Sequence, residues 1–210
     1  RFQSETGRKY LVDEAPVPSV TTILSATKDK KFLDDWRRRV GHQEADRIMN
    51  NASTVGTEMH RVLEYYYNGE KYYNETEEGI KPRKMAEVIK DSLVIDEVWG
   101  NEVSLAYKKE YAGTTDLVAM AYGKPSIVDF KQSNKPKKKE WITDYFFQVG
   151  AYALAHNHIY DSNISQGVIL VCTPPPNMEF QEFIICDDEF SFYQEEFIKK
   201  VKIYNERHSK

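Results

Sequence analysis

The first half of the chain carries apolar residues at helical spacing. Apolar side chains recur every three or four positions between residues 30 and 49, which predicts a helix. Residues 53–70 place a second apolar stripe at the same spacing, and residues 81–92 predict a third helix. A short extended segment precedes these helices. The Ser/Thr run after Pro18 is suited to capping the start of a helix.

After about residue 95, the apolar positions alternate with a period of two. The alternation predicts a strand over residues 103–107, a second over 116–121 and a third over 126–130. A turn at Gly123 joins the last two strands as a hairpin, so we expect them to lie side by side.

From residue 139 onward, segments with helical spacing of apolar residues alternate with segments that have a period of two. Residues 139–158 predict a helix, residues 167–173 and 179–186 predict two strands around a proline-rich turn, and a closing helix begins at residue 187 or 188. Strands in the middle with helices on both sides of them predict an α/β fold with a mixed central sheet flanked by helices. At 210 residues, we expect one domain, with a helical part over about 18–95 and a core over about 100–210.

Composition narrows the class of protein. The chain is 40% hydrophobic and 13% aromatic, which is typical of a folded globule, and we expect no membrane span because no apolar run approaches ~20 residues. Two cysteines are too few for an iron–sulfur cluster held by four cysteines, and we expect none. An intracellular protein is therefore expected, cytoplasmic in the first place, with the mitochondrial matrix as the alternative.

The formal net charge is −4, which on average disfavours nucleic-acid binding, but the basic residues are clustered. Arginines occupy residues 37–39, and lysines dominate residues 135–139. A locally positive groove on an acidic protein is compatible with this pattern. A solvated loop of lysines is an equally good interpretation of either cluster taken alone.

The stretch "SIVDFKQS" places two charges in an otherwise apolar strand. Asp129 and Lys131 lie two positions apart, so both side chains point to the same face of that strand. If the hairpin at Gly123 forms, Asp116 on the neighbouring strand can converge with Asp129. Two adjacent carboxylates repel each other, and a divalent cation such as Mg²⁺ or Mn²⁺ would relieve that repulsion. A partly buried salt bridge between Asp129 and Lys131 is the alternative.

Four motifs in one order carry a resemblance to a known family. They read "VGTEMHRVLE", "GTTDLVA", "SIVDFKQS" and "QVGAY", and "PSVTTIL" precedes them. This series resembles the PD-(D/E)XK nuclease superfamily, specifically its RecB-like exonuclease branch, and within it the genome-maintenance exonucleases of mitochondria and their phage relatives. The resemblance covers about residues 18–152. It implies a restriction-endonuclease-like core and a metal-dependent deoxyribonuclease.

The resemblance also implies roles for single residues. The metal ligands would be His60, Asp116, Asp129 and the backbone carbonyl of Phe130. Lys131 would be the catalytic lysine, supported by Gln148 and Tyr152, which share one helix face. Glu102 stands where relatives often carry an acidic residue, and we expect it to belong to the catalytic site as a second ligand of the metal or of a water molecule.

Six residues beyond these are candidates for contact with DNA. The lysine loop and its neighbours could bind phosphates, and an exposed aromatic side chain could stack on an unpaired base. The candidates are Ser133, Lys135, Lys137, Lys138, Lys139 and Trp141.

These residues, together with the resemblance, predict a Mg²⁺- or Mn²⁺-dependent DNA exonuclease that hydrolyses phosphodiester bonds. We expect it to act as a monomer on single-stranded DNA with a free end, in DNA recombination, replication or degradation. A non-catalytic nucleic-acid-binding module of nuclease descent and an endonuclease are the alternatives, and RNA cleavage is a lesser one. The polarity of digestion does not follow from the sequence.

Overall fold

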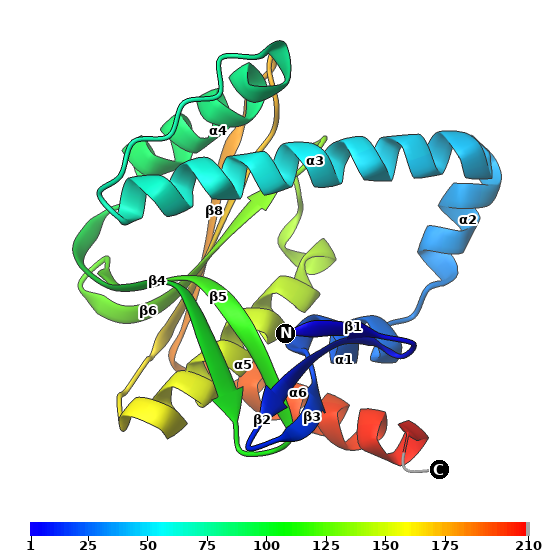
Figure 1. The fold of residues 1–210 in the computed structure, drawn as a ribbon, viewed down its shortest axis with the longest axis vertical. Helices are drawn as coiled ribbons and strands as arrows, with labels where there is room; N and C mark the ends of the chain where they lie inside the picture. The colour runs from blue at the N-terminus through cyan, green and yellow to red at the C-terminus, as the bar shows by residue number, and fades with distance from the viewer. Residues whose placement is uncertain (209–210) are drawn as a thin grey trace.

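The computed structural model describes residues 1–208 and shows a five-stranded sheet covered by helices on both faces (Figure 1). Helices α3 and α4 pack on one face of the sheet, and α5 and α6 pack on the other. The strands are β4 (Ile95–Tyr107), β5 (Tyr111–Ala121), β6 (Lys124–Gln132), β7 (Gln166–Cys172) and β8 (Phe180–Cys186). The helices are α3 (His42–Tyr67), α4 (Glu77–Ser92), α5 (Thr143–Tyr160) and α6 (Asp187–His208), and a short 3₁₀ turn (Lys139–Trp141) precedes α5.

The sheet has the order β4-β5-β6-β7-β8 and is mixed. Strands β4, β5 and β6 form an antiparallel meander, and β8 pairs antiparallel with β7. Strand β7 is parallel to β6, and α5 is the crossover that such a parallel pair requires. The expected α/β class with a mixed central sheet flanked by helices is therefore confirmed.

Two apolar clusters, one on each face of the sheet, form the core. The alternation along β5 explains the division, because Leu117 faces α3 and α4 while Val118 faces α5 and α6. Phe146 of α5 is fully buried in the second cluster, and Met59 of α3 is fully buried in the first. A buried side chain of this size stabilises the fold by roughly 1.5–3 kcal/mol.

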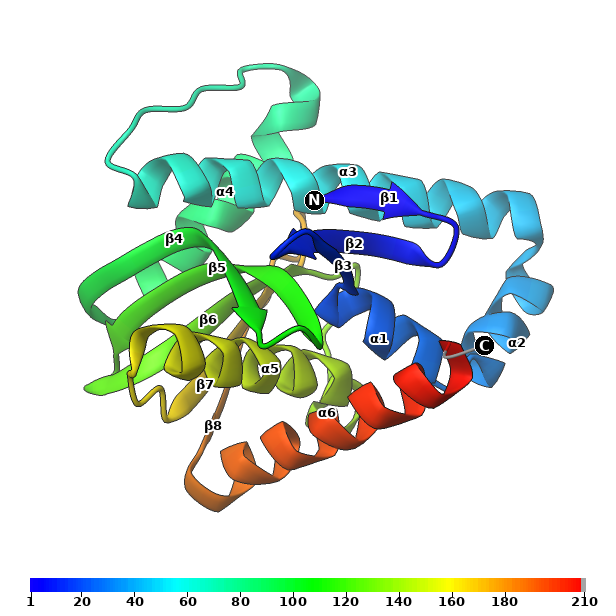
Figure 2. The ribbon, with the colours of Figure 1, turned by 60° about the horizontal axis from the view of Figure 1, so that its bottom comes forward.

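A small N-terminal sheet was not predicted beyond an extended entry. It contains β1 (Phe2–Ser4), β2 (Gly7–Val12) and β3 (Ala15–Pro18), all antiparallel, and it leads into α1 (Val20–Thr27). Figure 2 shows this sheet between α3 and α1, beside β5. The expected cap at the start of α1 is confirmed, since the Ser19 hydroxyl accepts a hydrogen bond of 3.0 Å from the Thr22 amide.

The predicted helix over residues 30–49 is wrong in its extent. Helix α2 (Lys31–Val40) ends at Gly41, whose φ of 91° is a conformation that glycine adopts readily. Helix α3 then runs unbroken for 26 residues through the gap expected between the first two helices. The α2 helix has no buried residue, so α2 and the start of α3 form an arm outside the core.

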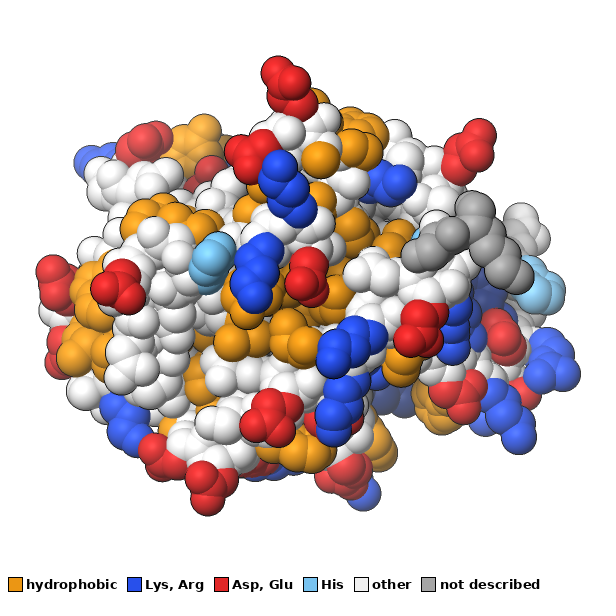
Figure 3. Space-filling view, turned by 90° about the horizontal axis from the view of Figure 1, so that it is seen from below, with side chains coloured by type: hydrophobic (Ala, Val, Ile, Leu, Met, Phe, Trp, Pro, Cys, Tyr) orange, Lys and Arg blue, Asp and Glu red, His pale blue; other side chains and the backbone are white. Residues whose placement is uncertain are grey.

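The surface mixes charged and hydrophobic side chains, and the described helices include no membrane span. Figure 3 shows basic, acidic and hydrophobic side chains intermixed on the face seen from below. Within residues 1–208, no helix combines the length and the apolar character needed to cross a bilayer. The expectation of one domain over residues 1–210 stays a prediction, and its last two residues lie outside the described part of the chain.

Candidate active site

The site forms where β5 and β6 separate. Leu117↔Val128 is the pair of β5 and β6 that lies nearest to the site. Asp116 is the next residue beyond this pair on β5, and Asp129 is the next residue beyond it on β6. One oxygen of Asp116, Oδ2, accepts a hydrogen bond of 2.8 Å from the Phe130 amide. A side chain thereby occupies the place of a backbone carbonyl, and beyond this point β5 pairs with β4 and, at Ala112, with Ser19. The two aspartates lie on inner strands of the five-stranded sheet.

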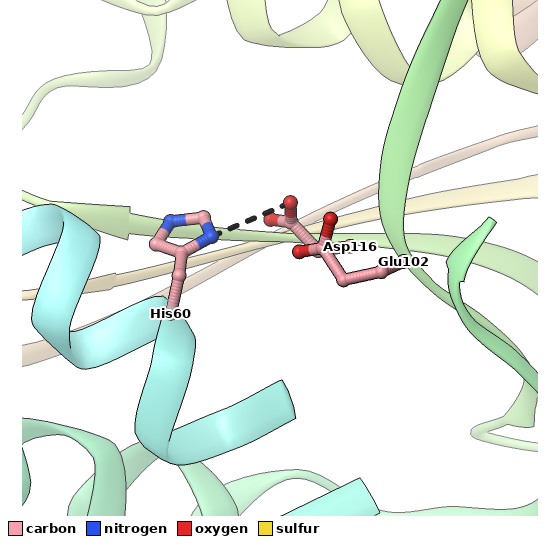
Figure 4. Close-up of side chains that lie close together, drawn as sticks. All are labelled: His60, Glu102 and Asp116. Carbon is pink, nitrogen blue, oxygen red and sulfur yellow. Dashed lines mark ion pairs between the residues drawn. The ribbon is translucent and has the colours of Figure 1, made fainter. Parts of the chain in front are cut away.

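Three side chains from three elements meet above this fork (Figure 4). Ligand atoms of His60 on α3, Glu102 on β4 and Asp116 on β5 all lie within 4.8 Å of one another. His60 Nδ1 is 3.4 Å from Asp116 Oδ1. Glu102 lies opposite Asp116, between the register pairs Asn101↔Leu117 and Val103↔Thr115 of β4 and β5. Its backbone is left-handed, with a φ of 49°. One imidazole and two carboxylates form a donor set that suits a divalent cation.

Asp129 and Lys131 form a pair beside the three-residue cluster. Lys131 Nζ lies 2.5 Å from Asp129 Oδ2 and 5.1 Å from the centre of the Tyr145 ring. Asp129 is 1% exposed, and neither of its carboxylate oxygens has a well-aligned hydrogen-bond donor within residues 1–208. Of the predicted ligand set, the structure groups His60 and Asp116 with Glu102, while Asp129 is not a member of this group of ligand atoms within 4.8 Å of one another.

The pKa values of these groups follow from burial and from neighbouring charges. Burial, together with the nearby Asp116, raises the pKa of Asp129 to about 6, although Lys131 acts in the opposite direction. Burial disfavours the charged forms of Asp116 and Lys131 as well. The surrounding charges outweigh it, so His60 and Lys131 lower the pKa of Asp116, and the two aspartates raise the pKa of Lys131. Lys131 is therefore an ammonium at neutral pH.

Glu102 is a carboxyl whose charged form is disfavoured in the folded protein. Burial, with Asp116 and Glu64 nearby, raises its pKa to about 7. Between the unfolded pKa near 4.5 and the folded pKa near 7, the folded state holds the proton more tightly. Glu102 therefore contributes stability below pH 4.5 that is lost as the pH rises to 7.

Replacing Glu102 by Gln should raise the melting temperature of chelator-treated protein at pH 8 because the glutamine carries no charge to desolvate. The gain should shrink below pH 7 and vanish near pH 4.5, where the wild-type side chain is neutral in both states. Thermal unfolding across this pH range measures it, with Glu97→Gln on the exposed side of β4 as the control. An equal gain at both ends of the range would contradict the argument.

The cluster opens into a hollow of about 460 Å³. Its polar lining comes from the N-terminal sheet, α1, α3, β4, β5, β6 and α5. Three residues of the predicted site, Lys131, Gln148 and Tyr152, are part of that lining, whereas Asp129 is not. The lining residues are Arg1, Arg8, Tyr10, Ser19, Thr21, Gly56, Thr57, His60, Arg61, Glu64, Glu102, Gly113, Thr114, Asp116, Lys131, Gln148 and Tyr152.

Gln148 and Tyr152 lie on one face of α5, and both line the hollow. The Gln148 amide donates a hydrogen bond of 3.5 Å to the Tyr152 hydroxyl. The Tyr152 ring packs against Gly113, the first residue of "GTTD", where an added Cβ would stand 2.6 Å from ring atom Cε1. Gly113 is therefore required so that the tyrosine can approach β5 closely.

Two glycine-to-alanine substitutions should change stability in opposite directions. Gly113→Ala should lower the free energy of unfolding by about 1–3 kcal/mol, because the Tyr152 ring is buried and cannot move aside. Gly56→Ala, within α3, meets only Gln132 at 3.7 Å and should raise it by about 0.8–1 kcal/mol through helix propensity. Urea unfolding measures both. Combining Gly113→Ala with Tyr152→Leu should recover part of the loss, and full additivity would refute the clash.

The candidate DNA-contacting residues lie outside the lining of the hollow, after β6. The Ser133 hydroxyl is buried and donates to the Lys135 carbonyl at 2.6 Å, so it is engaged within its own loop. Lys139 pairs with Glu189 at 2.7 Å. Lys138 lies over the ring of Trp141, which is 61% exposed.

The sequence interpretation missed several residues of the hollow. Arg8 and Tyr10 alternate along β2, so both reach one face, and this spacing is the signal that would have found them. Arg61 follows His60 on α3 and was also missed.

Curated proteins with related sequences were found at low identity. The chain is 27% identical over 206 residues to mitochondrial genome maintenance exonuclease 1 of Homo sapiens, covering 91% of this chain and 59% of that protein. It is 27% identical over 218 residues to the protein of the same name from Mus musculus, covering 97% and 63%. The chain thus spans about three-fifths of the length of these relatives. No family model matches the chain.

A solved structure shares the fold. It comes from Eubacterium rectale and is described as a presumptive exonuclease, with a TM-score of 0.52 and 12% identity over 73% of this chain and 65% of that one. The sequence matches and this fold are consistent with a PD-(D/E)XK-type nuclease.

Proposed function

We propose that this chain is a Mg²⁺- or Mn²⁺-dependent exonuclease of the PD-(D/E)XK type that hydrolyses phosphodiester bonds of single-stranded DNA from a free end. The observation that carries the proposal is the meeting of His60, Glu102 and Asp116 beside the Asp129–Lys131 pair. The exonuclease names of the relatives support the class of reaction. We propose action as a monomer in recombination, replication or degradation of DNA, in the cytoplasm or the mitochondrial matrix.

The residues present fit a divalent cation. The cluster offers one nitrogen and two carboxylates, and Asp129 adds buried carboxylate oxygens that have no well-aligned hydrogen-bond donor and lie beside Lys131. We propose His60, Asp116 and Asp129 as ligands, with the Phe130 carbonyl and Glu102 completing the set. The bound ion would neutralise charge on the phosphate and activate a water molecule as the nucleophile.

The side chains around this set would position the reactants. The Phe130 amide holds one oxygen of Asp116, which leaves the other oriented toward His60. Lys131, held as an ammonium by Asp129, would orient the attacking water and offset charge that develops on the phosphate. Gln148 and Tyr152 would support the lysine and the DNA backbone from α5.

Beyond the hollow, the loop after β6 would bind the DNA backbone. Ser133 and Lys135 would form its start, and Trp141 offers an exposed ring for stacking on an unpaired base. Lys139 would contribute least, because Glu189 already neutralises it.

Neutralising the loop should weaken DNA binding in a salt-dependent way. The triple variant Lys135→Gln, Lys137→Gln and Lys138→Gln should reduce the slope of log affinity against log salt by about 2, at ~0.7 for each phosphate that a lysine no longer neutralises. Fluorescence anisotropy with a single-stranded oligonucleotide in chelator measures the slope.

The matched control replaces three lysines of α4, none of which lines the hollow, and should leave the slope unchanged. They are Lys81, Lys84 and Lys90. Equal slopes for the loop variant and the wild type would exclude the loop from the DNA path.

The proposed function is tested by digestion of matched linear and circular single-stranded DNA with Mg²⁺, with Mn²⁺ and with chelator. Metal-dependent loss of the linear strand alone is expected. Loss of both strands would indicate an endonuclease, and survival of both in every condition would indicate a non-catalytic binding module. A linear RNA of the same sequence, expected to survive, tests the choice of DNA.

A further inference from the structure

The N-terminal sheet supplies one wall of the hollow that the proposed metal-binding cluster also lines. Arg8 and Tyr10 of β2 contribute to this wall, together with Ser19 and Thr21 at the start of α1. Neither β2 nor its side chains belong to the motifs from which the active site was expected. The wall therefore needs a separate explanation.

The backbone of Arg8 is held firmly. Its carbonyl accepts hydrogen bonds from the Ser19 amide at 2.9 Å and from the Thr22 hydroxyl at 3.0 Å. Strand β2 is joined to β5 by the hydroxyls of Tyr10 and Thr114, which lie 3.2 Å apart. Thr114 precedes Asp116 by two residues, so the support of the arginine is linked directly to the strand that carries the cluster.

The Arg8 side chain has no counter-charge. No carboxylate within residues 1–208 forms an ion pair with it, and the side chain remains exposed at the hollow. Of the other cations of the hollow, Arg61 pairs with Glu58 at 3.0 Å and Lys131 pairs with Asp129, whereas Arg1, which precedes the N-terminal sheet, forms no ion pair with the described residues. An unpaired guanidinium on a rigid strand, facing a polar hollow, is suited to an anion that enters from outside.

We infer that Arg8 binds a backbone phosphate of the nucleic-acid strand, at a nucleotide adjacent to the one being cleaved. The inference rests on the proposed function, because the strand must pass the cluster to place its scissile phosphate there. A guanidinium offers two parallel donors to one phosphate, which fixes the register of the strand without reading its bases. Arg8 is thus a substrate-binding residue that contacts no proposed metal ligand.

The first experiment compares Arg8→Gln with Lys9→Gln, its neighbour, which lines a different depression of the surface. In chelator, Arg8→Gln should weaken binding of a single-stranded oligonucleotide by ~10-fold at low salt and reduce the salt slope by about 0.7. Arg8→Lys should fall between Gln and the wild type, because it keeps the charge and loses the paired donors. Lys9→Gln should bind as the wild type does.

The second experiment locates the phosphate. In a series of oligonucleotides, each carries one uncharged methylphosphonate at a different position. At one position, the methylphosphonate should lower the affinity of the wild-type protein by ~10-fold. The same methylphosphonate should not lower the affinity of Arg8→Gln, since the variant has no guanidinium to bind that phosphate. The melting temperature and its increase with Mn²⁺ should be the same in Arg8→Gln and the wild type, which separates weaker binding from unfolding.

The outcomes distinguish this inference from the proposed function. Equal affinities for Arg8→Gln and Lys9→Gln, or equal methylphosphonate costs at every position in Arg8→Gln and the wild type, would overturn the inference even if the enzyme digests DNA. Failure of the wild type to bind the strand would overturn it too. Selective loss of affinity in Arg8→Gln together with no digestion in any metal would support the phosphate contact and reject the nuclease.

Discussion

Asp116→Asn should abolish digestion of single-stranded DNA, with a loss on the order of 10³-fold or more. The substitution removes a charge that would hold the cation, and the ion's contribution to the transition state is worth several kcal/mol. The amide oxygen of asparagine can still accept the hydrogen bond from the Phe130 amide, so the fork between β5 and β6 should persist. Digestion rates and the rise in melting temperature with Mn²⁺ are the two measurements, and the variant should lose both.

The chain offers a close control for this substitution. Asp96 also accepts a hydrogen bond from a backbone amide, that of Gly123 at 3.1 Å, but it lies outside the hollow. Asp96→Asn should digest DNA at the wild-type rate. An Asp116→Asn protein that kept its Mn²⁺ response and digested within tenfold of the wild type would remove Asp116 from the proposed ligand set.

Lys131→Met should lower digestion by about 10²–10³-fold while binding of the strand in chelator stays within about threefold of the wild type. Methionine retains an unbranched apolar stem beside Tyr145 and removes only the ammonium. In chelator, the burial that already raises the pKa of Asp129 to about 6 would then act without the opposing lysine, so this carboxyl would become neutral and the fold would avoid a buried unpaired charge.

A second lysine of the same strand serves as the control. Lys124 begins β6, pairs with Asp187 at 3.5 Å and lies outside the hollow, so Lys124→Met should leave digestion unchanged. Measuring the free energy of unfolding of Lys131→Met, alone and combined with Asp129→Asn, separates stability from chemistry. Undiminished turnover by folded Lys131→Met would exclude the ammonium from the reaction.

Local periodicity was sufficient to predict most of the elements of the central sheet and its helices. The period of two also placed Asp129 and Lys131 on one face, because adjacency on a strand face is a property of neighbouring residues. The two ends of α3 were harder to predict from the sequence. Gly41 interrupts the pattern through its own backbone conformation, and the polar residues after Met49 continue α3 because tertiary packing on its second half sustains the helix.

Contacts between distant segments were the part that periodicity could not supply. Glu102 joins His60 and Asp116 through the register of β4 against β5 and a left-handed backbone at Glu102 itself, neither of which has a local signature. The N-terminal sheet reaches the hollow only through its docking on β5. Such pairings depend on the whole fold, so Arg8 was not recognised as a neighbour of the cluster.

The unbroken length of α3 has a mechanical consequence. Its first half leaves the core, with Ala45 as the only buried residue there among those described, while Met59 and Leu63 anchor its second half. His60 stands between those two anchors. Because 26 residues extend for about 39 Å, the exposed first half of α3 reaches well away from the two buried side chains that fix the second half. The imidazole is therefore placed by the part of the helix that packs on the sheet, and the exposed part can vary in sequence without displacing His60 from Asp116.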